Sequence, residues 1–119
     1  MLLELRQDRD LEQLLERSVT HPVFIFKHST QCSISGQAHE EFSQFSEIAG
    51  DVPCGVVDVI ENRRLSNAIA SRFGVPHESP QALLVKEGQV LWHASHWSVT
   101  AGALSDALRS YAQPAHQRN

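Results

Sequence analysis

One cysteine stands among residues that could support thiol chemistry. Cys32 lies in the segment KHSTQCSIS (residues 27–35), directly after the apolar run VFIF (residues 23–26). The second cysteine, Cys54, is far along the chain, so this segment holds no Cys-x-x-Cys pair. Two interpretations are open: Cys32 is a small core residue that falls in a polar loop, or it is a nucleophile that works without a neighbouring thiol.

The predicted surroundings of Cys32 favour the second interpretation. The hydrophobic pattern places it past the carboxyl end of a strand at 23–26 and at the start of a helix at 34–49. The unpaired N–H groups and partial positive charge of a helix start favour the thiolate over the thiol. Hydroxyl and cationic side chains nearby would act in the same direction; they are Lys27, His28, Ser29, Thr30, Ser33 and Ser35.

The elements that would position Cys32 alternate between helix and strand. In chain order we predict a helix begun by a capping-box pattern at Asp10 and Gln13, a strand at 23–26, a helix at 34–49, a strand at 54–60, a helix from Asn62 to Gly74, strands at 81–86 and 89–94, and a helix that carries Leu104 and Tyr111. A right-handed crossover makes the first two strands parallel, and the turn Glu87-Gly88 makes the last two an antiparallel hairpin. The chain is thus predicted to be α/β, with a mixed four-stranded sheet flanked by helices in the thioredoxin-like arrangement.

The same pattern predicts how the ends of the chain behave. Residues 2–5 form a further edge strand in this prediction, beside the four strands of the sheet. Residues 1–119 form a single domain, and the tail at 113–119 is expected to fray.

Cys54 begins the second predicted strand, which places it away from Cys32. In a pair of parallel strands, the start of one strand lies at the opposite sheet edge from the end of the other. A strand of five or six residues spans ~17–20 Å, whereas the Cα atoms of a disulfide lie within ~7 Å. We expect Cys54 to be structural and to form no disulfide with Cys32.

Ser79-Pro80 precedes the predicted strand at 81–86 and is the second chemical signal. A proline ahead of a central strand interrupts the hydrogen-bond ladder, so its position calls for a reason. In thioredoxin-like proteins a cis-proline lies beside the active cysteine and leaves the backbone of the preceding residue free to pair with a substrate. An ordinary trans loop proline is the alternative for Pro80.

The segment WHASHWSVT (residues 92–100) joins the last strand to the last helix and is expected at the same sheet edge as Cys32. His96 and Trp97 offer a donor and a flat apolar surface beside a helix N-terminus, which would suit a small carboxylated ligand. The alternative is that Trp97 packs and His96 is solvated. For Trp92 and His93, inside the strand, we favour packing and solvation.

Composition limits the classes of function. The net charge is −4 and no basic stretch offers a phosphate footprint, so a nucleic-acid partner is not expected. No apolar run approaches the ~20 residues that cross a bilayer, and charge appears at Glu4 and Arg6 before any signal-peptide core develops. Two cysteines without an export signal predict reduced thiols in the cytoplasm.

Three segments in the same order, KHSTQCSIS, HESPQALL and WHASHWSVT, resemble the monothiol bacilliredoxins, the YtxJ-like family of thioredoxin-like proteins in the bacillithiol system. The resemblance extends from about residue 24 to residue 108. It implies a cytoplasmic thiol–disulfide oxidoreductase that removes bacillithiol from protein mixed disulfides. Its partners would be bacillithiolated proteins and a recycling thiol or redoxin, with bacillithiol as co-substrate and no permanently bound cofactor or metal.

The resemblance also implies roles for single residues. Cys32 would be the nucleophile, Pro80 the cis-proline, and Ser35 would stand where a dithiol relative carries its second cysteine. The malate carboxylates of bacillithiol would suit His96, the Lys27–His28 pair and the N–H groups of the final helix. One departure is Ser33, where the family usually has proline; this change bears on redox potential and rate.

Three other functions are compatible with these residues. A monothiol glutaredoxin-like enzyme would use another small thiol, such as glutathione or coenzyme A. A metal site could use His28 with Cys32, or His93 with His96, although an offset of three residues in a strand turns the two side chains to opposite faces. A non-catalytic thioredoxin-like module would leave the Cys32 pKa near ~8.5.

Overall fold

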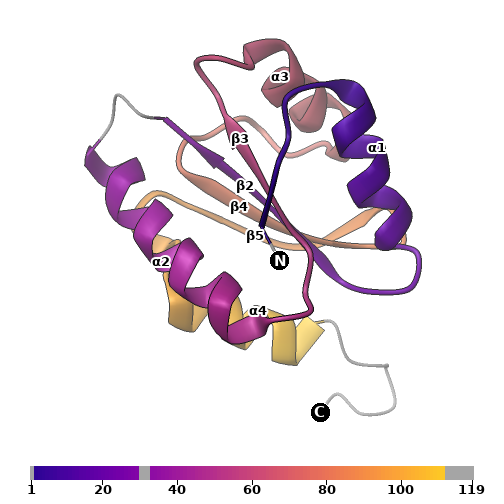
Figure 1. Cartoon of the computed structure of the whole chain (residues 1–119). Helices are drawn as coiled ribbons and strands as arrows, with labels where there is room; N and C mark the ends of the chain where they lie inside the picture. Colours follow the sequence, from indigo (N-terminus) through magenta and orange to yellow (C-terminus); the bar gives the residue numbers. More distant parts are fainter. Residues whose placement is uncertain (1, 30–32, 112–119) are drawn as a thin grey trace.

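A five-stranded mixed sheet separates two pairs of helices (Figure 1). The computed structural model describes residues 2–29 and 33–111. The elements are β1 (Leu2–Glu4), α1 (Asp8–Arg17), β2 (Val23–His28), α2 (Ser33–Ala49), β3 (Cys54–Asp58), α3 (Arg63–Phe73), β4 (Gln81–Lys86), β5 (Gln89–Ser95), the short 3₁₀ helix η1 (His96–Ser98) and α4 (Ala101–Tyr111). Helices α1 and α3 cover one face of the sheet, and α2 and α4 cover the other.

The strand order is β1-β3-β2-β4-β5, with the first three strands parallel and the last two antiparallel to their neighbours. This confirms the predicted α/β class, the parallel pair and the closing hairpin. It also confirms the N-terminal edge strand, which pairs with β3 through Leu2 opposite Cys54. The hairpin turn has positive φ at both Glu87 and Gly88, the geometry that matches the twist of the two strands.

Strand β2 lies in the middle of the sheet and is buried on both faces. Val23 and Ile25 contact the core formed with α1 and α3, whereas Phe24 and Phe26 contact the core formed with α2 and α4. Each of the four side chains has no exposed surface. The continuous apolar run therefore has a simple physical cause, because successive side chains of a strand enter different cores.

Several element boundaries differ from the sequence prediction by one or two residues, and side-chain hydrogen bonds explain two of these differences. Helix α1 begins at Asp8, not Asp10, since the Asp10 carboxylate accepts hydrogen bonds from the N–H groups of Arg6 at 2.9 Å and Gln7 at 3.1 Å, as a residue in the first turn does. Strand β3 ends at Asp58, two residues early. The carboxylate of Asp58 accepts the N–H groups of the next turn, from Ile60 and Glu61, and so ends the strand.

Within residues 2–29 and 33–111, no helix combines the length and the apolar character that crossing a bilayer requires.

Gly55 lies where α1 packs closely on the sheet, which yields a stability prediction. A Cβ at this position would stand 2.7 Å from methyl carbons of both Leu5 and Leu14, which are buried. We expect Gly55→Ala to lower the free energy of unfolding by about 1–3 kcal/mol, because a packed core must shift to admit the methyl group. Urea unfolding curves measure this change.

Gly102→Ala in α4 is the matched control, because a Cβ there meets no heavy atom within 4 Å. It should leave stability unchanged or raise it by roughly 0.5–1 kcal/mol through helix propensity. Equal unfolding midpoints for the two variants would contradict the close approach of α1 to β3.

Candidate active site

The antiparallel pairing of β2 with β4 brings two predicted site segments to one edge of the sheet. Lys27 lies opposite Gln81 in this pair. The segment that follows β2 and the segment that precedes β4 therefore start from neighbouring positions. The predicted residues Thr30 and Cys32 lie outside the described residues, between Ser29 and the start of α2 at Ser33.

Ser35 ties the first turn of α2 to the end of β2. Its side chain is fully buried, and its hydroxyl accepts a hydrogen bond from the N–H group of Ser29 at 3.2 Å. The structure thus joins the two described ends of the segment that contains Cys32. For Ser33 the structure gives the backbone position, as the first residue of α2.

The Ser79–Pro80 peptide bond is cis, the isomer that the family resemblance implies. Pro80 is buried, and its carbonyl oxygen accepts the N–H group of His96 at 2.8 Å. Gln81, the first residue of β4, donates a hydrogen bond from Nε2 to the carbonyl oxygen of Pro76 at 3.0 Å. Among the described residues, the buried hydroxyl of Ser79 has no hydrogen-bond partner.

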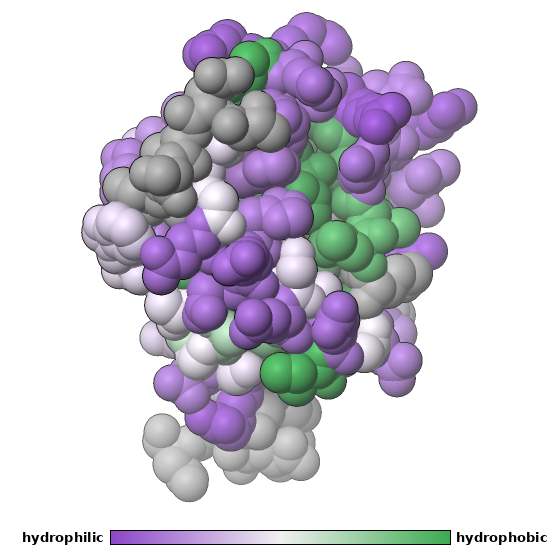
Figure 2. Space-filling model, turned by 60° about the vertical axis from the view of Figure 1, so that its left-hand side comes forward, coloured by the Kyte–Doolittle hydropathy of each residue, from purple (hydrophilic) through white to green (hydrophobic). Residues whose placement is uncertain are grey.

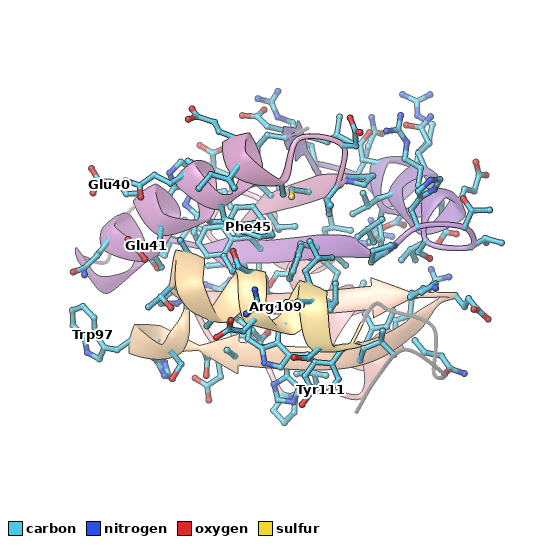
Figure 3. All side chains as sticks on the ribbon, turned by 90° about the horizontal axis from the view of Figure 1, so that it is seen from below. Glu40, Glu41, Phe45, Trp97, Arg109 and Tyr111 are labelled. Carbon is cyan, nitrogen blue, oxygen red and sulfur yellow. The ribbon has the colours of Figure 1, made fainter. Side chains whose placement is uncertain are left out.

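His96 and Trp97 lie in η1, directly after β5, and His96 contacts Glu78 and Pro80. His96 Nε2 is 3.2 Å from a carboxylate oxygen of Glu78, so the imidazole already has a partner within the chain. Trp97 is 63% exposed and projects outward at the end of the molecule where α2 begins (Figure 3). Glu78 is a site residue that the sequence analysis missed.

The N-terminus of α4 also has partners within the chain. The N–H group of Ala101 donates to Glu41 Oε1 at 2.9 Å, and the N–H group of Ala103 donates to Thr100 Oγ1 at 3.1 Å. A carboxylate at this position is favourable because of the partial positive charge of the helix start. This corrects the expectation that these N–H groups are free for a ligand carboxylate.

Lys27 points to the opposite face of the sheet from α2. Its side chain is fully buried, Nζ donates to the carbonyl oxygen of Ser66 in α3 at 3.0 Å, and His77 Nδ1 lies 3.4 Å from the same Nζ. Burial lowers the pKa of Lys27 to about 8. This placement corrects the expectation of a cation beside Cys32, because Lys27 shares its strand face with Ile25.

His28 lies on the α2 face, and its imidazole is not positively charged at neutral pH. Its ring stacks on Phe26 with centroids 5.7 Å apart, and the His39 ring centroid is 4.9 Å away. Burial, and then the neighbouring His39, lower the pKa of His28 below its usual 6.5, so the imidazole is neutral at pH 7. A neutral imidazole can both donate and accept a hydrogen bond.

The two imidazoles border a cavity of about 310 Å³ between α2 and the edge strand β1. Its polar wall includes Glu4, Asp58 and Glu61, and Leu2 contributes apolar surface. Figure 2, with the α2 side of the molecule turned forward, shows apolar surface between polar side chains on this face. In the part of the chain that the structure describes, no group of three or more His, Cys, Asp or Glu residues could hold a metal ion.

Cys54 is a buried thiol at the opposite end of the strands from His28. It is the first residue of β3 and lies beside Phe24, whereas Asp58 at the other end lies beside His28. Its Sγ contacts the carbonyl oxygen of Val52 at 3.4 Å, and burial raises the thiol pKa to about 11. This environment disfavours the Cys54 thiolate at neutral pH, as expected for a structural cysteine.

Comparison with known proteins adds two findings. The family model described as monothiol bacilliredoxin BrxC matches residues 3–104. Among solved structures, a candidate oxidoreductase with a thioredoxin fold is 32% identical, with a TM-score of 0.82, and the match covers 89% of this chain and 92% of that one.

Two thioredoxins share the fold at lower identity. The thioredoxin of Schistosoma mansoni is 23% identical, with a TM-score of 0.75 and coverage of 92% of this chain and 97% of that one. The thioredoxin of Fasciola hepatica is 17% identical, with a TM-score of 0.73 and coverage of 90% and 96%. These two similarities show the fold alone.

The buried Lys27 predicts a pH dependence of stability. Its pKa is lowered from 10.5 to about 8 on folding, so the unfolded chain binds more protons between these two values. The free energy of unfolding should therefore rise with pH across this window, by about 2–3 kcal/mol. Lys27→Met should remove the rise and should be more stable than the wild type at pH 7. Chemical unfolding at pH 7, 8, 9 and 10 measures both effects.

Lys86→Met is the matched control, since Lys86 ends β4 and is only partly buried. It should keep the wild-type pH dependence. A Lys27→Met variant that is less stable than the wild type at pH 7 and keeps the same pH slope would contradict the buried, destabilised ammonium.

Proposed function

This chain belongs to the monothiol bacilliredoxin family, and from that premise we propose that it removes bacillithiol from protein mixed disulfides by exchange at Cys32. It is a thiol–disulfide oxidoreductase of the thioredoxin fold. The observation that carries the single-thiol chemistry is the environment of Cys54, which is buried at the far end of β3 with a raised pKa. That environment leaves Cys32 as the cysteine available for exchange.

The proposed reaction has two exchange steps. The Cys32 thiolate attacks the bacillithiol sulfur of a client protein's mixed disulfide, and a bond forms between these two sulfurs. The bond from bacillithiol to the client breaks, the client thiolate leaves and takes a proton from solvent, and Cys32 stays linked to bacillithiol. A second bacillithiol thiolate, or the thiolate of a partner redoxin, then attacks the bound bacillithiol sulfur. The new bond gives bacillithiol disulfide, or a mixed disulfide of bacillithiol and the redoxin, and the bond to Cys32 breaks and releases Cys32 as a thiolate.

Two features of the described residues support this proposal. His28 is neutral and can exchange hydrogen bonds with a ligand at the end of β2. Ser35 holds the start of α2 against β2, so that the helix N-terminus can stabilise the proposed thiolate. In this proposal the backbone of Ser79 pairs with an extended client segment.

The clients are bacillithiolated proteins in this proposal, and the setting is the cytoplasm, where small thiols keep cysteines reduced. The match to the family model supports a thiol co-substrate. Which small thiol is used is tested by comparing client proteins modified with bacillithiol, glutathione and coenzyme A. Bacillithiol should be removed fastest.

Mass spectrometry after treatment with oxidised bacillithiol tests the single-thiol mechanism. We expect one bacillithiol adduct per chain, at Cys32, because Cys54 is buried and its thiolate is disfavoured. Cys32→Ser should lose both the adduct and the turnover of bacillithiolated client protein. Cys54→Ala is the matched control and should keep both. A Cys32–Cys54 disulfide, or turnover that survives in Cys32→Ser, would refute the mechanism.

A further inference from the structure

We propose that His96 is a positioning residue, which acts with Glu78 to hold η1 against the segment at Ser79 and Pro80 and so fixes the direction of the exposed Trp97. The sequence alone suggests that the imidazole of His96 binds a ligand directly. The structure points to a different role, because both hydrogen-bonding contacts of His96 described above are made within the chain.

The backbone of His96 is held in an unusual conformation. Its φ is +56°, in the left-handed region that residues with a side chain rarely adopt. Such a conformation costs free energy and persists only where the surrounding contacts over-determine it, as happens at functional sites. Among the described residues, the other non-glycine with positive φ is Glu87, which the hairpin turn explains.

Two contacts compensate for this conformation, and they flank Ser79. The N–H group of His96 donates to the carbonyl oxygen of Pro80 at 2.8 Å. Its Nε2 contacts the Glu78 carboxylate at 3.2 Å. Because one contact falls before Ser79 and the other after it, His96 holds η1 against the segment that would bind a client.

The residue that this contact positions is Trp97. The other tryptophan, Trp92, packs edge-on against Phe24 at 6.4 Å, whereas Trp97 is 63% exposed and projects from the fold (Figure 3). An exposed tryptophan on a rigid support is typical of the residues that contribute most to docking at protein interfaces. His96 directly precedes Trp97, so a change in the His96 backbone would redirect the indole.

Three variants separate positioning from direct ligand binding. His96→Gly keeps the backbone N–H group, suits the positive φ and removes the imidazole. Glu78→Ala removes the carboxylate but leaves the imidazole free for a ligand. The double variant tests coupling, because two changes that break one shared contact are not additive. Glu40→Ala and His93→Ala are matched controls at exposed positions.

The first readout needs no substrate. Protein labelled with 5-fluorotryptophan contains two tryptophans and should give two ¹⁹F resonances. The resonance of Trp97 should shift to the same new position in His96→Gly, Glu78→Ala and the double variant, while that of Trp92 stays in place. Neither control variant should shift the Trp97 resonance. An unchanged Trp97 resonance in the single variants would overturn the proposal.

The second readout rests on the proposed function and uses a bacillithiolated client protein. Each single variant should raise KM about three- to fivefold, the range that one half-exposed side-chain hydrogen bond supports, with kcat retained. The double variant should match either single variant. A rise in KM with His96→Gly alone would instead assign direct ligand binding to His96 and overturn positioning. If the wild-type protein does not turn over the client, the proposed function fails, and the ¹⁹F result still decides the role of His96.

Discussion

The site depends on one constraint, the antiparallel pairing of β2 with β4 in the centre of the sheet. Lys27 lies opposite Gln81 in this pairing, so the segment that contains Cys32 leaves the sheet where the cis Pro80 enters it. Burial of β2 on both faces fixes this register. A shift by one residue would turn Phe24 and Phe26 away from the core with α2 and α4 and into the core with α1 and α3. The chemistry we propose needs both segments at that edge.

The segment before β4 is held from two sides. On the α3 face of the sheet, Gln81 donates to Pro76, and His77 contacts both Lys27 and Ser66. From the η1 side, His96 contacts Glu78 and Pro80, the residues before and after Ser79. A buried ammonium such as that of Lys27 is costly, and its pKa is lowered accordingly. Preorganised segments of this kind lose less conformational entropy when they bind a partner.

Local patterns in the sequence predicted most of the fold, and contacts between distant residues explain the rest. The apolar runs, the turn at Glu87-Gly88 and the Ser79-Pro80 pair indicate elements whose causes are local. The apolar run ends at residue 26, so the sequence predicts that Lys27 lies in the loop near Cys32. The strand instead continues to His28, and the alternation of side chains along it places Lys27 on the α3 face. The contacts of Glu78 with His96 and of Glu41 with the start of α4 join distant segments, so no local pattern indicates them.

The central claim is that Cys32 is a nucleophilic thiolate near neutral pH, and its alkylation rate as a function of pH tests this most directly. Cys54 does not interfere, because it is buried and its pKa is raised to about 11. We predict that the rate at Cys32 rises with an apparent pKa clearly below the ~8.5 of a free cysteine. An apparent pKa at or above ~8.5 would contradict the account.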